Sequence, residues 1–204
     1  MRMIKEIFRS YAVFDANGRH TNGTDKQSNH NYSDAYENIF TVKGERQLPE
    51  LGVIMLNYPH STRNSVKLMM EIGIADGSSL LAWSEVFPNA QCVGMDIHHS
   101  NRARGDRIEF HIGDQRSLHD CNRVAGGRKF DFICEDATHQ LPDTLMTLLF
   151  MWPHVKQGGL YVIEEFQDIG SLRRNVEELF PNIEIVDTDG PFGNIESLVV
   201  LRKR

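Results

Sequence analysis

The sequence predicts an α/β protein with a doubly wound sheet that is mostly parallel and ends in an antiparallel last strand. Three observations support this fold class. Short apolar runs alternate with helical patterns from residue 66 onward, as in a parallel sheet with both faces covered. The first run ends in a glycine-containing turn at Gly73 and Gly77. The last two runs have no helix between them, which indicates an antiparallel addition at the sheet edge.

The elements are predicted in the following order. Residues 15–34 are polar and predict a loop, and Ser33 is a candidate N-cap for a helix that carries Tyr36 and Phe40 on one face. The predicted strands cover residues 66–72, 91–97, 107–112, 130–134, 160–163, 183–186 and 197–201. The predicted helices cover residues 78–87, 142–152 and a segment capped by Ser171, whereas residues 115–125 fit either a helix or a turn.

Length and composition indicate one domain, with residues 1–65 as an N-terminal extension or lid over the active site and residues 66–204 as the core. The formal net charge of −6 argues against a nucleic-acid partner, which needs a basic surface. The three cysteines lack C-x-x-C spacing, so we expect neither a disulfide framework nor a zinc site, and a reducing cytoplasm fits. No segment predicts a membrane span or a signal peptide, and no membrane partner is expected.

Residues at three successive strand ends predict a nucleoside site. The turn at Gly73 lets the backbone approach a ligand closely, and its spacing differs from that of a dinucleotide motif. Asp96 ends the second strand, where an acid can accept hydrogen bonds from ribose hydroxyls. Asp114 follows the third strand and is a candidate partner for an adenine amino group. Each of these residues alone could instead be a turn glycine or a helix cap, and their common edge of the sheet favours the nucleoside site.

Two acidic pairs predict a metal site beside it. Glu135-Asp136 and Glu164-Glu165 follow the fourth and fifth strands, so their carboxylates are expected at the same sheet edge. Oxygen ligands favour a hard ion such as Mg²⁺ or Ca²⁺, and a metal lowers the pKa of an alcohol that it contacts. His139 is a candidate general base because its pKa lies near neutrality. The alternatives are that the acids are solvated loop charges and that His139 caps the next helix.

These residues lie in motifs that resemble a known family. The matching set comprises Thr24-Asp25-Lys26, His30-Asn31-Tyr32, Tyr36-Glu37, Glu71-Ile72-Gly73, Gly94-Met95-Asp96-Ile97, Gly113-Asp114-Gln115, Glu135-Asp136-Ala137-Thr138-His139 and the segment 158–165. Together they resemble the class I S-adenosylmethionine-dependent O-methyltransferases of the macrocin and mycinamicin type, and more distantly the cephalosporin hydroxylase-like proteins. The resemblance covers about residues 21–40 and 66–168, and it implies a Rossmann-like methyltransferase fold.

The resemblance also implies residue roles. His139 would be the general base beside Asp136, and the metal ligands would be Asp136, Glu164 and Glu165. Lys26 would pair with the cofactor's carboxylate. The candidate cofactor-binding residues are Lys26, Tyr32, Glu71, Gly73, Asp96, Ile97, Asp114, Gln115 and Glu135. Three departures stand out, which are Ala137-Thr138 for the commoner Gly-Ser, Glu165 for the commoner Asp, and a longer connection over residues 43–65.

The expected function is therefore S-adenosylmethionine- and Mg²⁺-dependent methylation of a hydroxyl on a small molecule, namely a sugar or a glycosylated natural product. Two alternatives stay open at this point. One is a catalytically silent module that binds S-adenosylmethionine or a partner, and the other is a cephalosporin hydroxylase-like enzyme. Relatives of this family associate, so a homo-oligomer is also an open alternative.

Overall fold

The computed structural model describes residues 2–17, 19–26, 32–41, 47–48, 52–53, 63–166, 168–180, 183–187 and 197–204. Several expectations fall outside these residues. They concern His30 and Asn31 of the N-terminal motif, most of the 43–65 connection, and the turn at Asp189 and Gly190.

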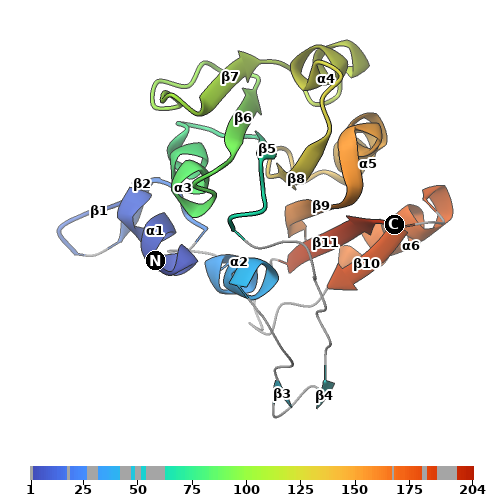
Figure 1. Cartoon of the computed structure of the whole chain (residues 1–204), viewed down its shortest axis with the longest axis horizontal. Coiled ribbons are helices and arrows are strands. Elements are labelled where there is room, and N and C mark those ends of the chain that lie inside the picture. The colour runs from blue at the N-terminus through green and yellow to red at the C-terminus, as the bar shows by residue number, and fades with distance from the viewer. Residues whose placement is uncertain are drawn as a thin grey trace.

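A seven-stranded sheet forms the centre of the molecule, with strand order β10-β11-β9-β8-β5-β6-β7 (Figure 1). Neighbouring strands from β7 to β9 pair in parallel, and β11 runs antiparallel to both β9 and β10. The predicted antiparallel last strand is therefore confirmed, and the final pair lies at the sheet edge with β10 outermost. The strands are β5 Leu68–Ile72, β6 Gln91–Asp96, β7 Ile108–Ile112, β8 Phe130–Glu135, β9 Val155–Phe166, β10 Ile183–Asp187 and β11 Ser197–Lys203.

Helices cover both faces of this sheet because its central strands are apolar on both sides. Helices α1, α2 and α3 share one buried cluster with the first face, and α4, α5 and α6 share a second cluster with the other (Figure 1). The helices are α1 Ile4–Tyr11, α2 Tyr32–Thr41, α3 Ser78–Val86, α4 Leu118–Ala125, α5 Leu141–Met151 and α6 Ile169–Leu179, with a 3₁₀ turn η1 at Trp152–His154. Two small hairpins pair β1 Ala12–Phe14 with β2 His20–Gly23, and β3 Gln47–Leu48 with β4 Gly52–Val53.

The N-terminal helices belong to the same hydrophobic core as the sheet. Aromatic rings of Phe8, Tyr36 and Phe40 contact those of Trp83 and Phe132 at centroid distances between 4.7 and 6.1 Å. All five side chains are at most 2% exposed. Aromatic pairs of this geometry add to the stabilisation that apolar burial provides. Helices α1 and α2 of the N-terminal extension are therefore anchored on the core.

The structure corrects several element boundaries. Helix α2 begins at Tyr32, which places Ser33 inside the helix, and β2 lies within the predicted 15–34 loop. Strand β9 begins at Val155, and Gly158-Gly159 lie inside it where its register with β8 shifts. Helix α6 is capped by Asp168, whose carboxylate accepts a hydrogen bond from the Ser171 backbone nitrogen at 2.9 Å. Among the described residues, no helix combines the length and apolar character that crossing a bilayer requires.

Candidate active site

A cavity of about 720 Å³ opens at the carboxyl ends of the parallel strands. Its wall includes residues at or just after the carboxyl ends of β5, β6, β7 and β8, Glu165 near the end of β9, and Gly23, Thr24 and Asp25 from the N-terminal segment. Ligands of doubly wound sheets bind at this edge, where the winding of the chain changes direction. The predicted nucleoside site and the predicted metal site therefore border the same space.

Gly73 forms the tight turn after β5. Its φ is +83°, and a Cβ atom there would lie 2.1 Å from the backbone oxygen of Asp136. A side chain is thus excluded by a neighbouring strand end as well as by the left-handed backbone. The Gly73 nitrogen donates to Met95 O at 2.8 Å, which fixes the turn against β6.

Asp96 shapes the loop that borders the cavity. One oxygen accepts hydrogen bonds from the Ile74 and Ala75 nitrogens at 3.0 and 2.9 Å, and the other accepts from His98 N at 2.8 Å. The carboxylate lines the cavity and retains lone pairs for a further donor. Ile97 beside it is 55% exposed and lines the same cavity, so it presents an apolar surface to a ligand.

The end of β7 contributes Asp114 and Gln115 to the wall. Both oxygens of Asp114 accept hydrogen bonds from the Arg116 guanidinium, at 3.0 and 2.8 Å, and these bonds lower the pKa of that carboxyl. Gln115 is 4% exposed, and its amide nitrogen donates to Thr138 Oγ1 at 3.1 Å. Its side-chain oxygen has no hydrogen-bond partner among the described residues, which leaves a buried acceptor at the cavity wall.

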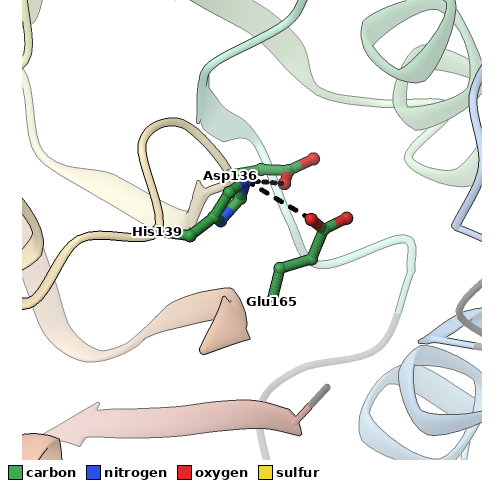
Figure 2. Close-up of side chains that lie close together, drawn as sticks. All are labelled: Asp136, His139 and Glu165. Carbon is green, nitrogen blue, oxygen red and sulfur yellow. Dashed lines mark ion pairs between the residues drawn. The ribbon is translucent and has the colours of Figure 1, made fainter. Parts of the chain in front are cut away.

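The side chains of Asp136, His139 and Glu165 converge, as Figure 2 shows, and all three line the cavity, where they form the cluster called the rim below. His139 Nε2 lies 3.4 Å from Glu165 Oε2 and 4.0 Å from Asp136 Oδ1. One ligand atom from each residue lies within 4.8 Å of the others, a spacing that could hold a metal ion. Two oxygen donors and one imidazole suit a hard or borderline divalent cation.

The backbone of this region is strained. Ala75, His139 and Glu165 have φ values of +44°, +55° and +57°, and they are the non-glycine residues with positive φ in the described chain. All three line the cavity. Strain of this kind is typical of functional sites, where the surrounding structure holds a side chain in a direction that regular structure would not allow.

The tautomer of His139 follows from its second nitrogen. Nδ1 lies 3.3 Å from the backbone oxygen of Glu164, which can only accept, so Nδ1 carries the proton in this hydrogen bond. In the neutral ring, Nε2 is then the nitrogen with a free lone pair. That nitrogen faces the two carboxylates at the rim.

Glu164 is connected to this cluster through Lys26, whose ammonium contacts both Glu164 and Asp136. It is 1% exposed, and one of its oxygens pairs with the ammonium of Lys26. The other oxygen accepts from the hydroxyl of Tyr36 and from Cys134 Sγ, the latter at 3.3 Å. The structure therefore brings together Asp136 and Glu165 of the predicted metal ligands, and it places Glu164 in a buried network behind them.

Lys26 is the centre of that network. Its Nζ lies 2.7 Å from Asp136 Oδ2 and 3.3 Å from Glu71 Oε1, in addition to its contact with Glu164. Burial lowers the pKa of Lys26, but the surrounding charges, Asp136 foremost, outweigh this effect and raise the pKa well above its usual value. Burial raises the pKa of Asp136 to about 7, even though Lys26 lowers it.

Four predicted cofactor-binding residues lie outside the described cavity wall. Lys26 is one of them. Tyr32 is another, and its hydroxyl accepts a hydrogen bond from the Glu165 nitrogen at 3.2 Å. Glu71 accepts from Ser79 and Trp83, and burial raises its pKa to about 7. Glu135 is 1% exposed, and burial raises its pKa to about 8.

Some residues of the site were given no role of their own by the sequence. Tyr36 was expected on an apolar helix face and Cys134 in a core strand, yet both contact Glu164. The spacing of Tyr32 and Tyr36 on one helix, four residues apart, could have indicated that both hydroxyls reach the same partner element. Thr138 lies in the matching motif, but the motif did not indicate that its hydroxyl accepts a hydrogen bond from the Gln115 amide.

Comparison with known proteins gives this geometry a context. Residues 70–166 match the profile of a methyltransferase domain. The chain is 30% identical to the mycinamicin VI 2''-O-methyltransferase of Micromonospora griseorubida over 131 residues, which are 57% of this chain and 33% of that protein. It is 32% identical to the demethylmacrocin O-methyltransferase of Streptomyces fradiae over 111 residues, 50% of this chain and 28% of that protein.

In structure, the chain is similar to the MycE methyltransferase from the mycinamycin biosynthetic pathway, solved in complex with Mg, SAH and mycinamycin VI. The TM-score is 0.72 at 20% identity, over 100% of this chain and 55% of that chain. The class I methyltransferase fold and the resemblance to macrocin- and mycinamicin-type O-methyltransferases are thereby confirmed. The chain spans about a third of the length of the curated relatives that it matches.

Proposed function

We propose that this chain, whose residues 70–166 match a methyltransferase domain, transfers a methyl group from S-adenosylmethionine to a hydroxyl of a sugar carried by a natural product, with Mg²⁺ at the reaction site. The observation that carries this proposal is the convergence of Asp136, His139 and Glu165 on one rim of the cavity. Gly73 and Asp96 line the same cavity. The residues proposed to act on the acceptor therefore lie beside those proposed to bind the methyl donor.

The cofactor would lie along the ends of β5, β6 and β7. Gly73 allows close approach of the backbone, and Asp96 retains acceptor capacity for ribose hydroxyls. Ile97 offers an apolar face to the adenine ring, and the unpartnered oxygen of Gln115 suits the adenine amino group. Asp114 could receive the same group beside its bonds to Arg116. These contacts recognise a nucleoside and require no phosphate group.

The donor set at the rim fits Mg²⁺. Asp136 and Glu165 provide carboxylate oxygens, the ligand type that a hard cation prefers, and the two acids would repel each other without one. A cation bound there would lower the pKa of an acceptor hydroxyl that contacts it. The remaining coordination positions would be available to water or to substrate oxygens.

His139 acts as the general base in this proposal. Its Nδ1 is held by the Glu164 carbonyl, so Nε2 is free to take the proton of the acceptor hydroxyl. The alcohol oxygen then bonds to the methyl carbon as the carbon–sulfur bond breaks, and the sulfur keeps that electron pair. The products are a methyl ether, S-adenosylhomocysteine and a protonated His139. Holding the two reactants in line is the main task of the cavity wall.

The sugar acceptor is supported by the names of the relatives. They include enzymes that methylate mycinamicin VI and a rhamnosyl tetracenomycin, both at named hydroxyl positions. The N-terminal extension would help to cover the acceptor, because Gly23, Thr24 and Asp25 line the cavity. We further propose that nucleic acid is not a substrate, given the net charge of −6. A cytoplasmic location and a homo-oligomer remain predictions.

Titration calorimetry and a methyl-transfer assay test the proposal. S-adenosylmethionine is titrated into the protein with and without Mg²⁺, and labelled methyl donor is then offered with a panel of glycosylated natural products and free sugars. We expect Mg²⁺-dependent labelling of a glycosylated acceptor that is lost in Asp136→Asn and Glu165→Gln. Cofactor binding with no metal effect and no labelled product would favour a silent module. Oxidised rather than methylated product would favour the hydroxylase-like alternative.

A further inference from the structure

We infer that Glu135, Thr144 and Tyr161 form a buried binding site for an ordered water molecule, and that this water joins the two ends of the loop 136–140. That loop carries Asp136 and His139. The three side chains are therefore positioning residues for the loop. The importance of the loop rests on the proposed function, whereas the water site itself does not depend on it.

The first support is that the strand side chains of this site lie on one face of the sheet. In the parallel pair of β8 and β9, Ile133 pairs with Tyr161 and Glu135 pairs with Ile163. Alternate residues of a strand point to the same face. Glu135 therefore faces the side on which Ile133, Tyr161 and Ile163 form part of a buried cluster.

Helix α5 covers this face and directs Thr144 toward it. Leu148 and Met151 of α5 belong to the same buried cluster. Thr144 precedes them by about one and two helical turns, so its side chain projects from the same side of the helix. Thr144 and Tyr161 are 0% exposed and Glu135 is 1% exposed, so all three polar groups are enclosed between helix and sheet.

The second support is that these polar groups lack partners. Both carboxyl oxygens of Glu135 and the hydroxyls of Thr144 and Tyr161 form no hydrogen bond with any of the residues that the structure describes. The groups are nevertheless near one another. Burial and the charge of Asp136 raise the pKa of Glu135, whereas the Thr144 hydroxyl lowers it. Burial raises the pKa of Tyr161, and the charge of Glu135 raises it further.

A water molecule matches the chemistry of this group of atoms. Buried polar atoms are normally hydrogen-bonded, because an unpaired one destabilises the fold. A buried water typically makes about three hydrogen bonds, and it both donates and accepts. It can donate to an oxygen of Glu135 and accept from the hydroxyls of Thr144 and Tyr161. Because water has both functions, it can serve the Glu135 carboxyl in either protonation state.

The position of the site shows what the water holds in place. Glu135 is the last residue of β8, and Gln140 is the N-cap of α5. The Thr144 nitrogen donates to Gln140 O at 2.9 Å, so Thr144 belongs to the first turns of the helix. A water between Glu135 and Thr144 joins the strand before the loop to the helix after it. His139 within the loop has φ +55°, a conformation that the surrounding structure has to maintain.

A high-resolution crystal structure of the full chain tests for the water directly. We expect one density peak about 2.7–3.2 Å from the Glu135 carboxyl and from the hydroxyls of Thr144 and Tyr161. Crystals grown with rubidium chloride are also measured at the rubidium absorption edge. An anomalous peak at this position would identify a cation site and overturn the inference. A direct hydrogen bond between Glu135 and either hydroxyl, with no density between the three groups, would overturn it as well.

Hydrogen–deuterium exchange, followed by mass spectrometry, tests whether the site holds the loop. Thr144→Val removes the hydroxyl and keeps the shape of the side chain. The amides of residues 136–140 should then exchange about tenfold faster or more, because a buried polar group has lost its partner. Thr144→Ser retains the hydroxyl and should leave this rate unchanged. Exchange in β6, which does not contact the site, should be the same in both variants and in the wild type.

Matched variants separate this site from a general loss of stability. Thr147 is equally buried on the same helix, but its hydroxyl donates to Asp143 O at 2.8 Å, so Thr147→Val should not speed exchange in the loop. Tyr161→Phe should act like Thr144→Val, and the double variant should add little, because both changes remove the same water. Adding Glu135→Leu should recover part of the unfolding temperature that the double variant loses, because the site is then entirely apolar.

Two outcomes of the exchange experiment would contradict the positioning role. One is unchanged exchange of the loop in Thr144→Val, and the other is equal acceleration in Thr144→Val and Thr147→Val. The crystallographic test on the wild type remains decisive for the water if the variants do not fold. If the wild type transfers no methyl group in the presence of Mg²⁺, the proposed function fails, whereas the electron density and the exchange rates still decide this inference.

Discussion

The absent side chain of Gly73 provides the space that the backbone carbonyl of Asp136 occupies. A Cβ atom on Gly73 would lie 2.1 Å from that oxygen and 2.7 Å from the Cα of Ala137. The Asp136 nitrogen donates to Ile72 O at 2.8 Å, so the two strand ends are also joined by a hydrogen bond. The turn at Gly73 and the strand end that carries Asp136 are therefore held in direct contact.

Gly73→Ala should destabilise the protein by more than the strain of its backbone alone. The clash is with backbone atoms that cannot rotate away, so we expect a loss of at least about 3 kcal/mol in the free energy of unfolding. Gly127→Ala is the matched control, because Gly127 has φ +73° and open space around its Cβ position. It should lose about 1–2 kcal/mol, the strain of a left-handed alanine. Equal losses in urea denaturation would contradict the packing argument.

His139→Asn should abolish turnover and preserve binding. Asparagine tolerates the left-handed backbone of His139, φ +55°, better than alanine does, so the loop should keep its shape. Loss of a general base is expected to lower kcat about 10²–10⁴-fold. The affinities for S-adenosylmethionine and Mg²⁺, measured by calorimetry, should stay within about twofold. A large loss of Mg²⁺ affinity would instead identify Nε2 as a metal ligand. His119→Asn on the exposed surface is the control.

Glu71 should make the metal-free protein less stable as the pH rises. Burial raises its pKa to about 7 from a usual value of 4.5, so the folded state keeps a proton that the unfolded state has lost in this range. Its contribution is present below about pH 4.5 and is lost as the pH rises toward 7, a change on the order of 2–3 kcal/mol. Glu71→Gln should show a flatter pH dependence in urea denaturation between pH 5 and 8. Identical slopes in both proteins would refute this assignment.

Asp168→Ala should remove the N-cap of α6. The carboxylate accepts from Ser171 N at 2.9 Å, and loss of such a cap costs about 1 kcal/mol. Ser171→Ala, at the position that the sequence favoured as the cap, should stay within about 0.5 kcal/mol of the wild type, because its hydroxyl is an exposed partner of Arg174. Thermal unfolding of the two variants shows which residue is the N-cap of α6. A larger loss of stability in Ser171→Ala than in Asp168→Ala would contradict the assignment of Asp168.

The sheet could be predicted from the sequence because its strands are buried on both faces and therefore appear as continuous apolar runs. The direction in which individual side chains point was harder to predict from the sequence. Successive residues of a regular strand face opposite sides, so the sequence alone does not say how Glu164 and Glu165 are directed. The set of Asp136, Glu164 and Glu165 as metal ligands stays a prediction. The structure places Glu164 inward and turns Glu165 outward through a left-handed backbone.

The buried network was beyond prediction for a different reason. Lys26 and Tyr36 meet Glu164 across separations of 138 and 128 residues, and no local pattern reports contacts between positions so far apart. The motif containing Lys26 indicated importance, but it could not distinguish a cofactor contact from a contact with buried acids. Helix α1 was also missed, although its buried residues Ile4, Ile7 and Phe8 have the i, i+3, i+4 spacing of an amphipathic helix.

The strand order has a consequence for how such a protein can diversify. From β5 the chain winds one way to β6 and β7, and it then crosses to β8 and β9 on the other side. In the proposed function, the loops of the first half would meet the nucleoside, and the second half would carry the base and the acids; residues of both halves line the cavity. Mutations in one half could therefore change the choice of acceptor without altering donor recognition in the other half. Strand β5 lies between the two halves.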